Sequence, residues 1–223
     1  MPEEPHTPTA PIFPLNTVLF PKMPLALQIF EERYKAMLAD IRDTDSRFIV
    51  ALIREGQEVG GPAEPYTVAC LAEITHLQPL PDDKFFLVAI GLSRVRILSI
   101  DATDKPYLVG TYEPLPEEMG DISPTTVDRA SNLFLQYAQY LMDATGEHTD
   151  NMILPADPDL LSCVIATALQ IGSAERQRLL EKSSTQQRLQ AELDLLLFEL
   201  PLMRALVNAP KPPDMGDGRF SSN

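Results

Sequence analysis

Several residue types on which catalytic and metal sites depend are scarce in this chain of 223 residues. Tryptophan is absent, and the chain has two cysteines and three histidines. Cys70 and Cys163 lie far apart in apolar segments, they form no C-x-x-C pair, and the acidic start of the chain lacks a secretory leader. We therefore expect reduced, buried cysteines in a cytoplasmic protein.

Basic residues are also few. The 18 Lys and Arg residues face 32 Asp and Glu residues, which gives a net charge of −14 and an isoelectric point near 4.5. A chain this acidic is repelled by phosphate backbones and anionic lipids unless its cations gather on one face, and the sequence has no basic run. We therefore expect neither nucleic acid nor a membrane surface as a partner.

A long hydrophobic run is missing as well. The most apolar stretch, 160–171, contains Ser162, Thr167 and Gln170. It falls well short of the roughly 20 residues that span a bilayer. Its near-continuous apolar character instead predicts a helix buried at the centre of the helical part.

The motifs of common enzymes are absent. The sequence has no phosphate-binding P-loop, no G-x-G-x-x-G turn and no G-x-S-x-G nucleophile elbow. His6, His76 and His148 are scattered and lack the i, i+4 spacing of a zinc helix. Cys163 could meet His76 or His148 in space, but a cysteine in an apolar helix is usually a packing residue. The sequence thus predicts no catalytic residue, no metal ligand and no cofactor.

Three acidic pairs could in principle hold a metal or transfer protons: Asp82-Asp83, Glu117-Glu118 and Asp157-x-Asp159. Their positions are a proline-flanked turn, a connection and a helix start. Turn chemistry, solvation and the helix dipole account for them. Acid–base work would require one buried carboxyl in a cleft, which nothing in the sequence indicates.

The hydrophobic period changes once, near residue 120. Short apolar runs before it predict strands at 12–20, 25–30, 48–53, 66–77, 85–90, 95–100 and 107–112. A helix is expected from about Glu31 to 43–45, and a tight turn at Gly91-Leu92-Ser93. Several short antiparallel strands with one inserted helix predict a small closed or partly closed barrel.

Helical spacing dominates after residue 120. Helix starts are predicted by capping residues at Ser123-Pro124, Asp157-Pro158 and Ser184 with Gln187. Gly172 is expected to stop the second helix, Ser173 to open a short one, and Pro201 to kink or break the last. The predicted class is α+β, with a disordered tail at 1–10, a β-rich part at 11–119, a helical bundle at 120–208 and a disordered tail at 209–223.

The segment PIFPLNTVLFP at 11–21, followed by Pro24-Leu25 and by IFEERY at 29–34, resembles the N-terminal domain of Lon proteases. The resemblance continues through 56–65, Gly91-x-x-Arg94, 106–108 and 179–189, and covers about residues 11–200. It implies a PUA-like barrel followed by helices, in which the motif residues act mainly as determinants of the fold.

In Lon proteases this region precedes ATPase and Ser–Lys peptidase domains, for which the present length leaves no room. The resemblance therefore implies a stand-alone, non-catalytic module that binds hydrophobic segments of protein partners. The expected site is an apolar groove between barrel and helices, where Met23, Met152 or Met203 could adapt to varied sequences, although each also suits a core. No individual residue is assigned to the binding surface.

Three other functions stay open at this point. An adaptor or assembly subunit would dock on a protease or chaperone through its helical face and return one stoichiometric partner. An enzyme, such as a peptidase, would show turnover. An RNA-binding PUA-like module would show salt-sensitive RNA affinity, which the net charge disfavours.

Overall fold

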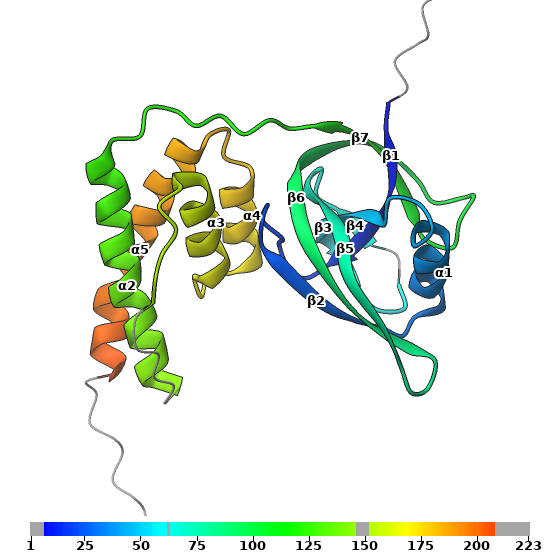
Figure 1. Cartoon of the computed structure of the whole chain (residues 1–223), viewed down its shortest axis with the longest axis horizontal. Coiled ribbons are helices and arrows are strands. Elements are labelled where there is room, and N and C mark those ends of the chain that lie inside the picture. The colour runs from blue at the N-terminus through cyan, green and yellow to red at the C-terminus, as the bar shows by residue number, and fades with distance from the viewer. Residues whose placement is uncertain (1–6, 62, 146–151, 208–223) are drawn as a thin grey trace, which may run out of the picture.

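The computed structural model describes residues 7–61, 63–145 and 152–207. Within them the strands come first and four of the five helices last (Figure 1). The strands are β1 (Thr9–Leu15), β2 (Pro24–Ile29), β3 (Arg47–Gly56), β4 (Ala63–Pro65), β5 (Val68–Leu80), β6 (Lys84–Asp101) and β7 (Leu108–Pro114). The helices are α1 (Glu32–Ile41), α2 (Pro124–Thr145), α3 (Pro158–Ala168), α4 (Ser173–Leu180) and α5 (Thr185–Val207).

The strand order returns to its starting point. β1 pairs with β7, and the order continues through β6 and β5 to β3, which pairs in parallel with β1. The other contacts on this path are antiparallel. β4 pairs antiparallel with the end of β3, and β2 pairs with the first half of β6. A closed order of this kind leaves few unpaired backbone edges, which protects a sheet from aggregation.

Alternate residues of β1 enter two different apolar cores. Phe13 and Leu15 join the large core that includes α1 and the later helices, whereas Ala10 and Ile12 join a smaller one on the other face of the sheet. This division follows from the two-residue period of a strand. On the large-core side the ring of Phe13 stacks on Tyr34 of α1, with centroids 3.9 Å apart.

β6 is one strand of 18 residues, so the turn predicted at Gly91 is wrong. Gly91 instead lets segment 20–23 approach the strand closely. Its N–H donates to the carbonyl of Met23 at 3.0 Å, and its carbonyl accepts from the N–H of Lys22 at 2.7 Å. A Cβ at Gly91 would lie 2.3 Å from the carbonyl oxygen of Phe20. A glycine in a strand often marks such a close approach, and the sequence alone does not separate this from a turn.

The capping residues expected at three helix starts are confirmed. The side-chain oxygens of Ser123, Asp157 and Ser184 accept hydrogen bonds from backbone N–H groups two or three residues later, at 3.2, 3.1 and 3.2 Å. Each bond satisfies a donor that the first helical turn leaves unpaired. The helix expected to open at Ser173 is α4.

Two helix ends differ from expectation. α3 ends at Ala168, and Gly172 is the N-cap of α4 rather than the stop of α3. α5 does not break at Pro201 but continues to Val207. Packing of the helix against its neighbours outweighs the lost hydrogen bond there, since Leu200 and Met203 on either side both contact the large core.

The tails differ in part from the prediction. β1 begins at Thr9, inside the segment 1–10 that was expected to be a tail, because Thr9 and Ala10 pair with Thr111 and Gly110 of β7. Residues 1–6 and the predicted tail 209–223 lie outside the described residues.

α3 and α4 lie between the sheet and the outer pair formed by α2 and α5 (Figure 1). The large core is continuous across this boundary and contains both Phe48 of β3 and Leu161 of α3. The side-chain amide of Gln177 in α4 also donates to the carbonyl of Val68 in β5 at 2.9 Å. No helix in the described part of the chain is long and apolar enough to cross a membrane.

We expect Gly91→Ala to lower the free energy of unfolding by about 3 kcal/mol or more, because a backbone carbonyl cannot move aside as a side chain can. Chemical denaturation measures this loss. Gly172→Ala is the matched control, since nothing lies within 4 Å of a Cβ at Gly172 and its φ is −63°. Equal losses in the two variants would contradict the close-approach explanation.

Candidate functional site

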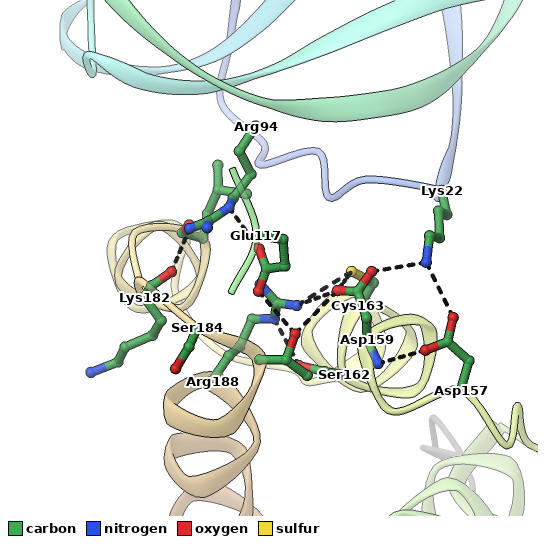
Figure 2. Close-up of polar contacts among 12 residues, drawn as sticks. Lys22, Arg94, Glu117, Asp157, Asp159, Ser162, Cys163, Lys182, Ser184 and Arg188 are labelled. Carbon is green, nitrogen blue, oxygen red and sulfur yellow. Dashed lines mark hydrogen bonds and ion pairs between the residues drawn. The ribbon is translucent and has the colours of Figure 1, made fainter. Parts of the chain in front are cut away.

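Arg94 of β6 is buried where the sheet meets the helices (Figure 2). Its Nη1 donates to the carbonyl of Leu180 at 3.0 Å and also to that of Lys182, both at the C-terminal end of α4. Its Nη2 donates to the carbonyl of Pro116 at 3.1 Å. One guanidinium therefore connects the sheet, the end of a helix and the segment 115–123 between β7 and α2, which we call the linker. Its positive charge also stabilises carbonyl groups that the helix leaves unpaired.

Glu117 of the linker joins this arginine to a second one. Its two oxygens lie 2.8 Å from Nε of Arg94 and 3.1 Å from Nη1 of Arg188 in α5. Nη2 of Arg188 lies 2.8 Å from Asp159 of α3, whose other oxygen is 2.8 Å from Nζ of Lys22. Figure 2 shows the resulting chain of ion pairs, which we call the junction cluster. It reaches from β6 through the linker, α5 and α3 to segment 20–23.

Glu192 of α5 adds a fully buried carboxyl to the cluster. Arg188 donates to Ser162 at 2.7 Å, and Ser162 donates to Glu192 at 2.8 Å. Burial raises the pKa of Glu192 to about 8, although Arg188 and the bond from Ser162 act against this rise. Glu117 and Asp159 already pair with Arg188, so a protonated Glu192 leaves the interior without an uncompensated charge.

The sequence predicted an apolar groove between sheet and helices, and the structure has a small hollow of about 160 Å³ there. This hollow is lined by apolar residues, Leu92 among them, and by the charged residues Lys22, Arg94, Glu117 and Asp159. Its position coincides with the junction cluster, whose ion pairs take up the charges. We therefore assign the junction a structural role.

A larger apolar cavity lies on the sheet part, at the end of the smaller core. It holds about 500 Å³, and Leu108 belongs both to its lining and to that core. We call it the sheet cavity. Its lining comes from β1, α1, β3, β4, the end of β6, the start of β7 and the connection between these last two strands. It comprises Pro14, Arg33, Glu55, Gly56, Ala63, Glu64, Pro65, Ile100, Ala102 and Leu108.

The rim of the sheet cavity is charged. Arg33 pairs with Glu31 at 3.0 Å and donates to the carbonyl of Glu58 at 3.0 Å, which leaves its guanidinium engaged. Glu64 pairs with Arg54 across the β3–β4 ladder. Glu55 lines the cavity and has no ion-pair partner among the described residues. The rim therefore presents an uncompensated negative charge beside an apolar hollow.

The residues that the sequence offered for an adaptable groove do not converge. Met23 is buried in the large core, Met203 packs against that core, and Met152 is exposed in the connection before α3. None of the three lines the sheet cavity. Met23 and Met203 are therefore packing residues of the large core, which was the alternative to a role in a groove.

Nucleophilic chemistry finds no support in the described residues. Cys70 and Cys163 are free and buried, and burial raises the pKa of both thiols, to about 12 for Cys163. His76 is exposed on β5, and His6 and His148 lie outside the described residues. No group of three or more His, Cys, Asp or Glu side chains in the described part is placed to hold a metal ion.

The acidic pairs have different surroundings. Asp82 and Asp83 both have positive φ angles, 58° and 53°, in the β5–β6 turn. Asp157 caps α3 as expected, but Glu117 and Asp159 belong to the junction cluster, which sequence reasoning missed. The available signal was an arginine inside apolar periodicity, at Arg94 in a strand and Arg188 in a helix.

Residues 9–197 match the family described as the ATP-dependent protease La (LON) substrate-binding domain. The chain belongs to this family. The match confirms the resemblance to Lon that the motifs at 11–34 predicted, and its span includes the junction cluster and the lining of the sheet cavity.

The relatives of this Lon substrate-binding domain chain are much longer. It is 27% identical over 192 residues to Lon protease of Anaeromyxobacter dehalogenans and 26% identical over 203 residues to that of Haemophilus influenzae. These alignments cover 83% and 88% of this chain but 22% and 25% of the relatives. The chain therefore spans about a quarter of their length.

Two solved structures share the fold of this Lon-family chain. A Lon N-terminal domain protein from Xanthomonas campestris has a TM-score of 0.64 at 23% identity, and the N-terminal domain of a Mycobacterium avium complex Lon protease has 0.60 at 16%. The first covers 84% of this chain and 98% of its own, and the second 85% and 98%. Both likenesses concern the fold.

We expect Arg94→Met to lower the free energy of unfolding by about 3 kcal/mol, because the change leaves Glu117 with one cation in place of two and removes the buried donor to the carbonyls at the end of α4. Arg96→Met is the matched control, since Arg96 is two residues away in β6 and pairs with Glu113 at the surface. That change is expected to cost less than about 1 kcal/mol. Chemical denaturation at neutral pH compares them, and similar costs would refute the structural role of the cluster.

We expect Glu192 to make the free energy of unfolding fall as the pH rises, which is the opposite of the effect of a salt-bridged carboxyl. Its pKa is higher in the folded chain than its ordinary value of 4.5, so folding takes up a proton. The free energy of unfolding should then fall between about pH 5 and 8, by at most about 1.4 kcal/mol per pH unit. Glu192→Gln should remove this contribution.

The measurement is denaturation at several pH values between 5 and 8 for the wild type, Glu192→Gln and the control Asp128→Asn, whose side chain is exposed on the adjacent helix α2. We expect the difference between Glu192→Gln and wild type to shift in favour of the variant as the pH rises. Parallel profiles for all three proteins would show that Glu192 titrates at its ordinary pKa.

Proposed function

We propose that this chain is a non-catalytic module that recognises exposed hydrophobic segments of protein partners. Membership of a substrate-binding domain family supports a polypeptide as the partner. The buried, protonated thiols and the engagement of Glu117 and Asp159 in ion pairs support the absence of chemistry. The engaged junction directs the proposal to another surface of the molecule.

The sheet cavity is the observation that carries this proposal. Its volume of about 500 Å³ falls within the roughly 300–1,000 Å³ typical of ligand pockets. Pro14 and Pro65 give it stiff walls, and Ile100 is partly exposed on its lining. An apolar side chain of an unfolded segment would remove this surface from water at a pre-formed site, which limits the entropy lost on binding.

The negative charge at the rim of the sheet cavity adds a preference for basic residues in the bound segment. Glu55 at the rim has no ion-pair partner in the described structure, and the chain carries a net charge of −14. A segment with a lysine or arginine beside its apolar residues would gain from both the local and the overall field. We therefore propose apolar segments flanked by basic residues as the preferred clients.

The same proposal includes two features of architecture. We infer that the closed order of β1, β7, β6, β5 and β3 is the small barrel predicted from the sequence, because each of these strands has two partners on this path. We also infer that α2 to α5 form one bundle, supported by the contacts of α5 with the other three. The closed strand order holds most of the walls of the sheet cavity in place.

An adaptor that docks on a protease or chaperone is the second candidate. The apolar side chains Leu197, Phe198 and Leu202 exposed on α5 favour it, since exposed apolar patches often mark protein contacts. RNA binding has no comparable support, because the net charge is −14 and surface arginines such as Arg54 and Arg96 are paired with carboxylates.

The test is a titration of a fluorescein-labelled peptide, Gly-Lys-Leu-Ile-Phe-Leu-Lys-Gly, followed by anisotropy. Ile100→Glu places a charge in the cavity lining and should weaken binding by at least about tenfold. Leu98→Glu is the matched control, since Leu98 is exposed on the same strand and does not line the cavity. A version of the peptide with glutamate in place of lysine should bind more weakly than the original.

Absence of wild-type binding at about 100 µM would overturn the proposed function, since this corresponds to a free energy of only about −5.5 kcal/mol. Equal weakening by both substitutions would overturn the assignment to the sheet cavity.

A further inference from the structure

α5 has two apolar faces, and only one of them is covered. Leu189, Leu193 and Leu196 are buried in the large core. Three other apolar residues of α5 are exposed: Leu197, Phe198 and Leu202. The exposed fraction of Phe198 is 66%. A surface helix ordinarily has polar residues opposite its buried stripe, and a helix that is apolar on both sides is normally covered on both.

The exposed residues of α5 follow the spacing that is typical of two helices packed side by side. Asp194, Phe198, Pro201 and Ala205 are exposed and follow each other at intervals of four, three and four residues. This is the a/d spacing with which one helix packs against another. We call these four positions, with Leu197 and Leu202 beside them, the outer face of α5.

A hollow of about 320 Å³ lies beside the outer face. It is formed by Gln136 and Tyr140 of α2 together with Leu197, Leu200, Pro201 and Arg204 of α5. The exposed ring of Phe198 and this hollow thus lie within one turn of each other on α5. In a twofold interface each copy contributes both halves of such a contact.

We propose that the outer face of α5 binds a second copy of this chain as an antiparallel helix pair. A twofold axis between Glu199 and Leu200 brings Phe198 of each copy level with Pro201 of the other, and Pro201 lines the hollow. Phe198 of the second copy then fills the hollow beside Pro201. The contact closes on itself, so the product is a dimer rather than a filament.

Charge favours the same arrangement. Asp194 precedes the axis and Arg204 follows it by nearly equal distances along the helix, and both are exposed. Antiparallel pairing therefore brings Asp194 of one copy near Arg204 of the other, twice in each dimer. A parallel pair would instead place like charges at the same level, which disfavours that alternative.

The position of the outer face leaves the sheet cavity accessible. α2 and α5 form the end of the molecule away from the sheet (Figure 1). Pairing through α5 would thus leave both sheet parts free at opposite ends of a dimer. One helix pair buries less than a standard interface, so we expect a dissociation constant in roughly the micromolar range.

Sedimentation equilibrium of the full chain at about 1–200 µM tests the proposal. The wild type should show a monomer–dimer equilibrium. Phe198→Glu should weaken it by about 100-fold or more, because the residue enters the interface twice. Ile153→Glu is the control, since Ile153 is 91% exposed outside α5 and should leave the equilibrium unchanged. Circular dichroism should show equal helix content in all three proteins.

Charge reversal tests the antiparallel geometry separately. Asp194→Arg and Arg204→Asp should each weaken the homodimer, because each places like charges opposite one another. An equimolar mixture of the two variants should recover a heterodimer of near wild-type affinity, detected by native mass spectrometry.

A wild type that stays monomeric at 200 µM, or a Phe198→Glu variant that stays dimeric, would overturn the proposal and assign the outer face to a different protein. Failure of the mixture to recover would overturn the antiparallel pairing. None of these outcomes depends on peptide binding at the sheet cavity.

Discussion

The ion pairs from Arg94 through Glu117 to Arg188 are the constraint on which the rest of the structure depends. They join β6, the linker and α5 within one buried region, and Arg94 also binds the carbonyls at the end of α4. Hydrophobic contact alone would hold sheet and helices together without fixing their orientation, since it has no direction. Buried charges are costly to separate from their partners, and the hydrogen bonds from Arg94 to backbone carbonyls are directional, so together they define one arrangement of the two parts.

That arrangement decides where binding can occur. The charges at the junction are paired with one another, and both binding surfaces that we propose lie away from it. The sheet cavity offers a pre-formed apolar hollow beside Glu55, and the outer face of α5 offers a stripe built around Phe198. A recognition module with separate surfaces for clients and for a second copy could engage one polypeptide at two points, which raises the effective affinity without stronger single contacts.

Much of the fold could be predicted from the sequence, because local signals determine local structure. The sequence predicted the helix caps at Ser123, Asp157 and Ser184, and it also predicted most strands. The prediction at Gly91 was wrong because a tight turn and a close approach of distant backbone both require a glycine, and the sequence does not distinguish them. Arg94 and Arg188 stood in the quoted motifs, but their partners are distant in sequence, and only the folded chain brings them together. The sheet cavity could not be predicted for the same reason, since its lining comes from separate strands, from α1 and from the β6–β7 connection.

The central claim is that apolar segments bind at the sheet cavity and not at the junction or at α5. Amide hydrogen exchange of the full chain, with and without saturating unfolded polypeptide, tests it most directly. The account predicts slower exchange in β4 and at both ends of the β6–β7 connection, with α3 and the Arg94 region unchanged. Slower exchange confined to the helices, or to segment 20–23 and the linker, would contradict it.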